Sequence, residues 1–106
     1  MQDSVKIFLD DERPTPQGWY RTYTVEETIA KLLTRQVTEL SLDNDLGEEL
    51  EGYKVLDWLE EQIYNDSSFP LPEITVHSAN ASRVVYMHRA IESIKKIRLT
   101  QLDKLI

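Results

Sequence analysis

Apolar and polar positions along the chain fall into two repeating patterns, one with the period of a strand and one with the period of a helix. Short apolar or alternating runs rich in β-branched and aromatic residues predict four strands, at 5–9, 19–24, 39–43 and 73–78. Apolar residues three or four positions apart predict three helices, at 25–35, at 53–65 and over a long segment after residue 80. Because strands alternate with helices, we expect an open α/β sheet.

The first and last of these helices carry signals for where they begin. Thr24 followed by Glu27 is typical of a capping box, in which each side chain satisfies a free backbone N–H at the helix start. Either Ser78 or Asn80 is expected to cap the last helix. The apolar stripe expected to bury the first helix comprises Val25, Ile29, Leu32 and Leu33.

The connections between the strands predict their order in the sheet. Only a proline-containing loop, 12–18, links the first two strands, but about ten residues at ~3.3 Å each can run back along a strand of ordinary length. We therefore predict four parallel strands in order 2-1-3-4 with three helices. Right-handed crossovers would place helices 25–35 and 53–65 on one face of the sheet, and the last helix is expected to cover the other face.

Length, charge and cysteine content narrow the class of protein. The chain has 106 residues, which suits one domain spanning 1–106. Its net charge of −7 argues against a nucleic-acid duplex as a partner, although a small phosphorylated ligand can still be held through a metal. It has no cysteine, no signal-peptide pattern and no apolar run of the ~20 residues that a membrane span needs. We expect a cytoplasmic monomer or weak dimer with no membrane partner.

Acidic side chains follow two of the predicted strands at the point where each strand ends. Asp10 and Asp11 end the first strand, and Asp43 ends the third, with Asp45 close behind. Ligands of open α/β sheets bind outside the carboxyl ends of the strands, and Mg²⁺ and Mn²⁺ prefer oxygen ligands such as carboxylates. We therefore predict that Asp10, Asp11 and Asp43 share one Mg²⁺ or Mn²⁺ ion. The alternative is that these acids are ordinary turn residues.

His77 follows the fourth predicted strand and would lie at the same edge of the sheet. An imidazole transfers protons near neutral pH, which suits protonation of the leaving oxygen of a phosphate ester. Asp43 and His77 are therefore the candidate catalytic residues, and the alternative for His77 is a structural residue held by hydrogen bonds. The acidic segment GEELEG, 47–52, is expected to be a solvated loop beside the site that could act as a lid.

Polar side chains around these acids are candidates for binding a phosphate group. Arg13 could bind phosphate bidentately, or it could form a salt bridge with Glu12 or Asp45. Ser78 and Asn80 could donate hydrogen bonds to phosphate beside a helix N-terminus, whose free N–H groups favour anions, or they could only cap that helix. The candidate ligand-binding residues are Arg13, Asp45, Ser78 and Asn80.

Three stretches of the chain together resemble a known family. FLDDERPTPQGW, LSLDNDLGEELEGYKVLDWLEE and ITVHSANASRVVYMHRAIESI are similar to cyclic-phosphate processing receiver domains, over roughly residues 5–98. The resemblance implies a reduced receiver-like, or flavodoxin-like, fold and a role in acting on cyclic phosphates of nucleotides or RNA ends. It also implies that Asp10 and Asp11 hold the metal and that Asp43 is a further ligand or a nucleophile.

Two departures separate the chain from the receiver domains of two-component signalling. His77 stands where those domains carry Ser or Thr at the end of strand four. The Lys of their fifth strand has no counterpart, because no fifth strand is predicted. The missing Lys argues against ordinary aspartyl-phosphate signalling.

The sequence leaves three functions open. The first is a metal-dependent phosphoesterase that opens a cyclic phosphate, and its turnover should be lost in Asp43→Ala. The second is a non-catalytic module that senses or sequesters a phosphorylated ligand or blocks a protein partner, and the third is a phospho-accepting regulator. We also expect His77→Gln to lower kcat without changing metal binding or melting temperature. Asp10→Asn is expected to raise the melting temperature of the metal-free protein, because one repelling charge is removed.

Overall fold

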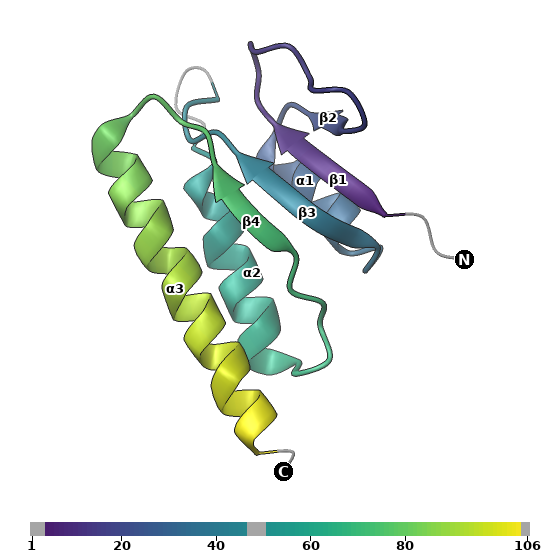
Figure 1. Ribbon diagram of the computed structural model, residues 1–106, viewed down its shortest axis with the longest axis vertical. Helices are drawn as coiled ribbons and strands as arrows, with labels where there is room; N and C mark the ends of the chain where they lie inside the picture. The colour runs from purple at the N-terminus through teal and green to yellow at the C-terminus, as the bar shows by residue number, and fades with distance from the viewer. Residues whose placement is uncertain (1–3, 47–50, 105–106) are drawn as a thin grey trace.

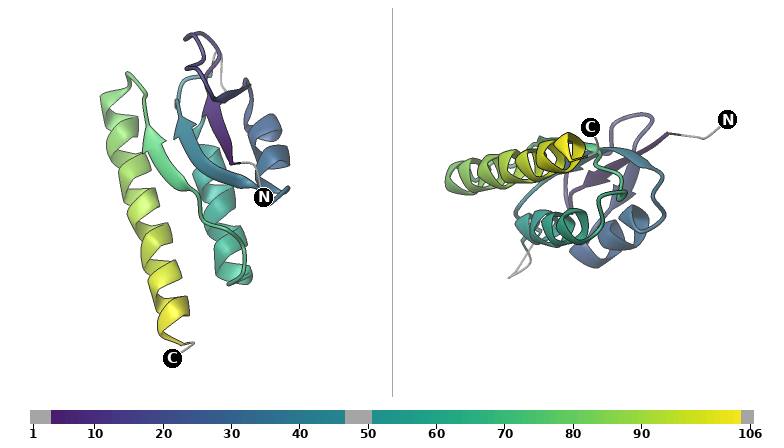
Figure 2. Two further views of the ribbon diagram at one scale, coloured as in Figure 1. Left: turned by 45° about the vertical axis from the view of Figure 1, so that its right-hand side comes forward. Right: turned by 90° about the horizontal axis from the view of Figure 1, so that it is seen from below.

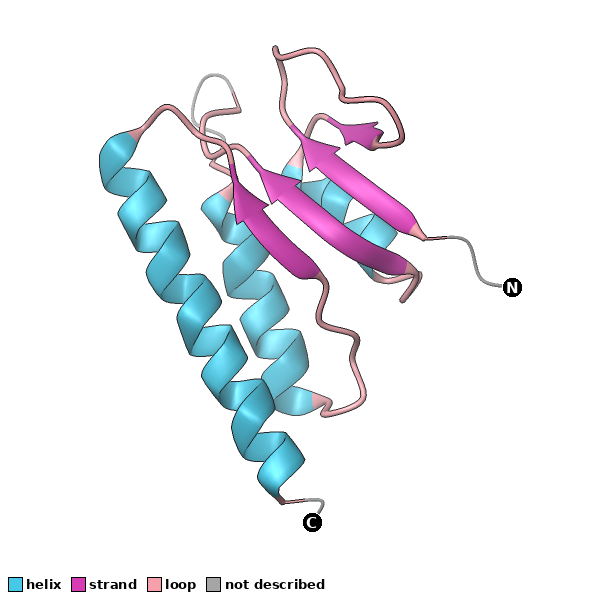
Figure 3. Cartoon of the chain, viewed as in Figure 1, coloured by secondary structure: helices cyan, strands magenta, loops and turns pink. Residues whose placement is uncertain are grey.

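The computed structural model describes residues 4–46 and 51–104, and these residues form a parallel sheet with three helices (Figures 1 and 3). The strands are β1 (Val5–Leu9), β2 (Tyr20–Thr22), β3 (Val37–Leu42) and β4 (Glu73–Val76). The helices are α1 (Val25–Leu32), α2 (Tyr53–Asn65) and α3 (Ala81–Asp103). The strands lie in the order β2-β1-β3-β4 with every neighbouring pair parallel, which confirms the predicted fold. Most of the segment expected to act as a lid, 47–50, lies outside the described residues.

The link from β1 to β2 runs as a loop without a helix, as predicted, and the two strands are parallel. Gly18 has a φ of 86°, a left-handed conformation that glycine adopts without steric cost, and it turns the chain into β2. Arg21 of β2 ties the loop to the sheet, because its Nε donates to Thr15 Oγ1 at 2.9 Å and its Nη1 donates to the Asp10 carbonyl at 2.6 Å. The loop therefore leaves the end of β1 in a fixed direction.

Helices α1 and α2 cover one face of the sheet and pack against each other (Figure 2), as right-handed crossovers predict. Helix α3 packs along α2 and contacts the sheet at its edge strand β4. The prediction that α3 covers the opposite face is therefore wrong. The reason is that its buried residues, Met87, Ile91 and Ile94, complete the same core as the residues of α2. Within the described residues, the opposite face of the sheet carries no helix.

The core lies between the sheet and helices α1 and α2. The fully buried apolar strand residues that face it are Ile7, Leu9, Leu40 and Leu42. Burial of each such side chain stabilises the fold by ~1.5–3 kcal/mol relative to exposure. Leu33 was predicted to join this core but is 57% exposed, because α1 ends at Leu32 and Leu33 is its C-terminal cap.

The helix starts fall where the sequence predicted, but the capping box is half formed, because Glu27 Oε1 accepts from the Thr24 hydroxyl at 3.3 Å and not from the Thr24 N–H. Thr24 Oγ1 accepts the Glu27 N–H at 3.1 Å. Asn80 caps α3, since its Oδ1 accepts the Arg83 N–H at 3.2 Å, and Ser78 Oγ accepts the Asn80 N–H at 3.1 Å. In the described ranges, no helix combines the length and the apolar composition of a membrane span, although α3 has 23 residues.

Candidate functional site

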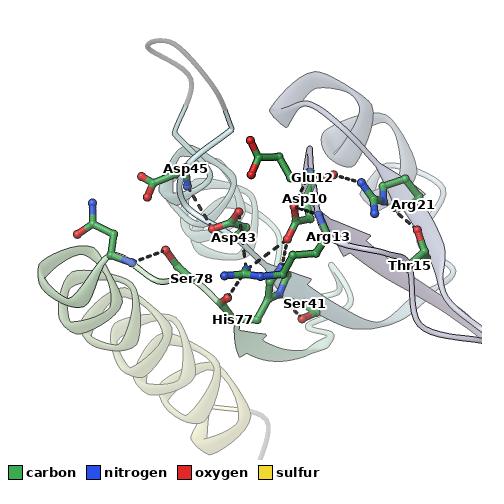
Figure 4. Close-up of polar contacts among 11 residues, drawn as sticks. Asp10, Glu12, Arg13, Thr15, Arg21, Ser41, Asp43, Asp45, His77 and Ser78 are labelled. Carbon is green, nitrogen blue, oxygen red and sulfur yellow. Dashed lines mark hydrogen bonds and ion pairs between the residues drawn. The ribbon is translucent and has the colours of Figure 1, made fainter.

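The face of the sheet that carries no helix bears a group of polar side chains at the carboxyl ends of the strands (Figure 4). Phe8 of β1 pairs with Ser41 of β3, and Ser41 pairs with Thr75 of β4. Side chains alternate between the two faces with a period of two. The next row on the same face, two positions further along each strand, is Asp10, Asp43 and His77. Backbone hydrogen bonds continue the ladder as far as this row.

Asp10, Asp43 and His77 form a compact group, as their positions in the sequence predicted. Each offers one potential ligand atom, and the three atoms lie within 4.8 Å of one another. Asp10 is fully buried, Asp43 is 7% exposed, and His77 is half-buried. Because little water reaches these charges, they interact more strongly than charges on an open surface. These three residues and Arg13, which contacts all of them, are called the carboxyl-end cluster below.

Asp10 receives hydrogen bonds on both of its carboxylate oxygens. Its Oδ1 accepts the backbone N–H groups of Glu12 at 2.8 Å and Arg13 at 2.9 Å. Its Oδ2 accepts from Arg13 Nη1 at 3.3 Å and lies 3.0 Å from His77 Nε2. Burial alone would raise the pKa of Asp10, but the two backbone N–H groups and His77 outweigh it and hold this pKa below its ordinary value. Asp10 is therefore charged and fixed in position.

Asp43 is the less compensated of the two carboxylates. Its Oδ1 accepts the Asp45 N–H at 3.3 Å, and its Oδ2 lies 3.9 Å from Arg13 Nη1. Burial raises the pKa of Asp43, and the nearby charge of Asp10 raises it further, while the Asp45 N–H and Arg13 offset only part of this increase. An added cation or proton would therefore stabilise Asp43 more than it would stabilise Asp10.

Both ring nitrogens of His77 are engaged. Nδ1 lies 2.7 Å from Ser41 Oγ, and Nε2 lies 3.0 Å from Asp10 Oδ2. The ring stacks on Phe8, with centroids 4.4 Å apart and an interplanar angle of 5°. Burial lowers the pKa of His77, and the neighbouring carboxylates recover only part of that decrease. The neutral ring then has one consistent arrangement, in which Nε2–H donates to Asp10 and the Ser41 hydroxyl donates to Nδ1.

Arg13 reaches into this group from the loop that follows β1. Its Nη1 lies 2.6 Å from the His77 carbonyl oxygen, 3.3 Å from Asp10 Oδ2 and 3.9 Å from Asp43 Oδ2. A salt bridge was one of the two predictions for this residue, but the predicted partners, Glu12 and Asp45, were wrong. The Arg13 side chain is 44% exposed, so one side of it faces solvent while Nη1 contacts the carboxylates.

The other predicted site residues lie around the cluster without joining it. Asp11 is half-buried and does not belong to the group of potential ligand atoms. Asp45 is exposed, forms a short antiparallel bridge with Glu51 and points away from Asp43 in Figure 4. Ser78 and Asn80 both act in the α3 cap, which is one of the two roles predicted for them. Their contact with a phosphate group stays a prediction.

Ser41 belongs to the site and was not predicted from the sequence. It is only 6% exposed and its hydroxyl contacts His77 Nδ1. The signal that could have identified it is the alternation of β3, because Ser41 precedes Asp43 by two positions and must share its face. A polar residue between two core leucines is also unusual unless its hydroxyl has a partner.

The backbone that carries Asp43 is held by the start of α2. The buried Asn44 accepts the Gly52 N–H on its carbonyl at 2.7 Å and the Tyr53 N–H on its Oδ1 at 3.2 Å. A Cβ atom at Gly52 would lie 1.9 Å from the Asp43 carbonyl oxygen. Only glycine fits this close approach, and the contact fixes where Asp43 lies.

Comparison with known proteins identifies the family. The cyclic-phosphate processing receiver domain matches the chain over residues 5–93, a range that includes the carboxyl-end cluster. No curated protein and no solved structure matches the chain. Receiver domains often bind Mg²⁺ through acidic residues, and here two aspartates lie beside a histidine at the carboxyl ends of the strands. The chain belongs to the family of cyclic-phosphate processing receiver domains.

Proposed function

We propose that the carboxyl-end cluster is the active site of a metal-dependent phosphoesterase that opens cyclic phosphates of nucleotides or RNA ends. The observation that carries this proposal is the convergence of two buried carboxylates and an imidazole, with potential ligand atoms within 4.8 Å, beside a partly exposed arginine. Membership of a family linked to cyclic-phosphate processing supports the substrate class.

The donor set fits a divalent cation. Carboxylates suit both Mg²⁺ and Mn²⁺, and an imidazole ligand favours a transition metal such as Mn²⁺. Asp10 and Asp43 would hold the ion, and His77 would join them with its proton on Nδ1, donated to Ser41 Oγ, so that Nε2 is free for the ion. Asp11 stays a predicted further ligand. When bound, such an ion polarises a phosphoryl oxygen and makes a bound water more acidic.

Asp43 and Arg13 are the less constrained members of the cluster, and we assign them the contacts with the reacting groups. Within the described residues, the Asp43 side chain accepts a single long hydrogen bond, from the Asp45 N–H at 3.3 Å, so its carboxylate can orient the attacking water and accept its proton. Arg13 has a partly exposed guanidinium, whose planar array of donors matches two oxygens of a phosphate group. Asp10, which is fully hydrogen-bonded, keeps its charge and orients His77.

The contacts of His77 favour a positioning or ligand role over that of the general acid expected from the sequence. A general acid needs a proton directed at the leaving oxygen, whereas Nε2 faces Asp10 and Nδ1 faces Ser41. The lowered pKa of His77 also keeps the ring neutral near pH 7. We therefore expect His77→Gln to weaken metal binding together with turnover, in place of an isolated loss of kcat.

The test is hydrolysis of a 2′,3′-cyclic nucleotide by the purified chain with Mn²⁺ or Mg²⁺, followed by separation of the products. Asp43→Asn should lower kcat by ~10²-fold or more, because the positioned base is lost. His88→Gln is the matched control, since His88 is the other histidine of the chain and is exposed on α3. Turnover that is unchanged in Asp43→Asn would contradict the proposal.

A non-catalytic binding module is the second candidate. The engagement of both His77 nitrogens favours it, because these contacts direct neither nitrogen toward a substrate. Binding of the cyclic nucleotide without turnover in either metal, and loss of that binding in Arg13→Gln, would select this function. Isothermal titration with the same cyclic nucleotide measures the binding.

A further inference from the structure

We propose that Arg13 is a built-in competitor of the divalent ion, with its guanidinium lying between the carboxylates of Asp10 and Asp43 until a phosphate group draws it out. The inference rests on the proposed function, because it concerns the same ion and the same phosphate. It assigns a second role to Arg13: control over when the ion binds.

The position of one nitrogen atom carries the inference (Figure 4). Nη1 of Arg13 contacts both carboxylates, at 3.3 Å from Asp10 Oδ2 and 3.9 Å from Asp43 Oδ2. A hydrogen bond of 2.6 Å to the His77 carbonyl oxygen holds Nη1 there. The guanidinium thus supplies a positive charge to the same residues that would hold the ion.

Electrostatic repulsion opposes binding of the divalent ion while the guanidinium of Arg13 lies in the cluster. Asp10 and Asp43 together carry two negative charges, and the guanidinium cancels one of them. Because both carboxylates are buried, water screens the repulsion between the guanidinium and a second cation only weakly. An arriving ion must therefore displace Arg13 or bind a cluster with half of its negative charge cancelled.

The attachment of Arg13 permits such a displacement. Its backbone is fixed, since the Arg13 N–H donates to Asp10 Oδ1 at 2.9 Å. The side chain beyond it is 44% exposed and can swing toward solvent while the backbone stays in place. A phosphate group offers Arg13 two charged acceptors in exchange for the contacts that it leaves. Phosphate binding and metal binding should therefore strengthen each other, and thermodynamic linkage requires this effect to be reciprocal.

The first experiment measures Mn²⁺ binding alone, by electron paramagnetic resonance of the free ion, in the full chain and in Arg13→Gln. We expect Arg13→Gln to bind Mn²⁺ ~10- to 100-fold more tightly, because the competing charge is gone. Arg83→Gln is the matched control. It removes one positive charge from the start of α3, where Arg83 pairs with Glu51 at 3.3 Å, and it should change the affinity by less than about threefold.

A second variant guards against a loss of folding in Arg13→Gln. Arg13→Lys keeps the positive charge on a similar stem, so its Mn²⁺ affinity should stay within about fivefold of the unmodified chain. Far-ultraviolet circular dichroism shows whether each variant is folded at the temperature of the titration. If Arg13→Lys binds Mn²⁺ as tightly as Arg13→Gln does, the inference is overturned, because loss of the positive charge would not be the cause of the tighter binding.

The second experiment adds phosphate. Titration of Mg²⁺ with and without millimolar inorganic phosphate should show that phosphate tightens Mg²⁺ binding in the unmodified chain, and by a smaller factor in Arg13→Gln. Equal factors in the two proteins would overturn the release of Arg13 by phosphate.

The outcomes separate this inference from the proposed function. If the unmodified chain binds Mn²⁺ and Arg13→Gln binds it no more tightly, the competitor role is wrong and the metal site still stands. If neither protein binds Mn²⁺, the metal-dependent function and the competitor role both fail. If only Arg13→Gln binds Mn²⁺, the inference is supported in its strongest form.

Discussion

Two aspartate–arginine pairs lie at opposite ends of the sheet and differ in what surrounds them. Asp10 and Arg13 belong to the carboxyl-end cluster. At the other end, where α2 leads into β4, Arg35 Nη2 lies 2.7 Å from Asp66 Oδ2. The second oxygen of Asp66 accepts the Ser68 N–H at 2.9 Å and the Ser68 hydroxyl at 2.6 Å. Arg35 and Asp66 are called the amino-end pair below.

The difference lies in the balance of charge and in exposure. The hydrogen bonds from Ser68 and Arg35 lower the pKa of Asp66 to about 2, and both side chains of the amino-end pair are well exposed. The carboxyl-end cluster instead adds a second buried carboxylate, Asp43, whose pKa is raised. A balanced and solvated pair only holds two segments together. A pair whose aspartate is buried beside surplus negative charge can gain free energy by binding a cation, so the same two residue types can serve structure at one end and binding at the other.

The largest effect on stability is expected when the buried Asp10 loses its charge. Asp10→Asn should lower the free energy of unfolding of the metal-free protein by ~2–4 kcal/mol, because an amide nitrogen would face the donors on Arg13 and His77. This replaces the expectation from the sequence that the variant would melt higher. That expectation considered repulsion from Asp43 but not the four hydrogen-bond donors around Asp10.

Asp66→Asn is the control for this measurement and should cost much less, because Asp66 is exposed and an asparagine can still accept from Ser68. Urea denaturation of both variants at pH ~7 measures the difference. Equal losses in the two variants would show that the two pairs do not differ in the way described.

A second prediction concerns the backbone that holds Asp43. Gly52→Ala places a Cβ against the Asp43 carbonyl, so we expect a loss of ~1–3 kcal/mol together with weaker Mn²⁺ binding, because Asp43 must shift. Gly18→Ala is the matched control: its Cβ meets no atom within 4 Å, but its φ of 86° costs an alanine ~1–2 kcal/mol. Both variants lose stability, and only Gly52→Ala should lose metal affinity. Unchanged Mn²⁺ affinity in Gly52→Ala would contradict the role assigned to this contact.

The sequence predicted what depends on local pattern and on strand order. The bounds of β1 and α2, the parallel order, the loop crossover and the meeting of Asp10, Asp43 and His77 all follow from periodicity and from the rule that parallel strands end at one edge. These features require no knowledge of where any side chain points.

The sequence did not predict what depends on tertiary placement. The direction of the Arg13 side chain, its contact with Asp43 and the contact of Ser41 with His77 arise only after β1, β3 and β4 are in register. The predicted position of α3 was also wrong, because its apolar stripe could pack on either the sheet or α2 and the sequence pattern alone does not distinguish the two.

A third prediction uses pH to separate the two ends. The pKa of His77 in the folded metal-free protein is below the ~6.5 of the unfolded chain, so between these values the unfolded state binds more protons and stability rises with pH. The free energy of unfolding should therefore fall as the pH drops from ~7.5 to ~5.5, and His77→Gln should flatten this slope. Urea midpoints across this range measure it, and an equal slope in His77→Gln would refute the assignment.

The aspartates titrate in a lower window. Asp66 contributes stability that is present above its unfolded pKa of 3.8 and is lost as the pH falls toward about 2. Asp43 acts in the opposite sense just above 3.8, because its folded pKa is raised and the folded state then binds more protons. Asp66→Asn should therefore leave the slope between pH ~5.5 and ~7.5 unchanged, which makes it the control for His77→Gln.

The smallest effect is expected at Arg35, the counterpart of Arg13 in the amino-end pair. Arg35 has a φ of 63°, a left-handed conformation that costs a residue with a Cβ ~1–2 kcal/mol. Arg35→Ala and Arg35→Gly both remove the ion pair with Asp66, but only glycine also removes the cost of the left-handed backbone. Glycine makes the unfolded chain more flexible, and this flexibility lowers the stability of the glycine variant by ~0.4–1 kcal/mol. The glycine variant should therefore be more stable than the alanine variant by roughly 0.5–1 kcal/mol in urea denaturation. Neither variant should alter Mn²⁺ affinity, and a change as large as that expected for Arg13→Gln would mean that removing any arginine tightens metal binding, whichever end of the sheet it occupies.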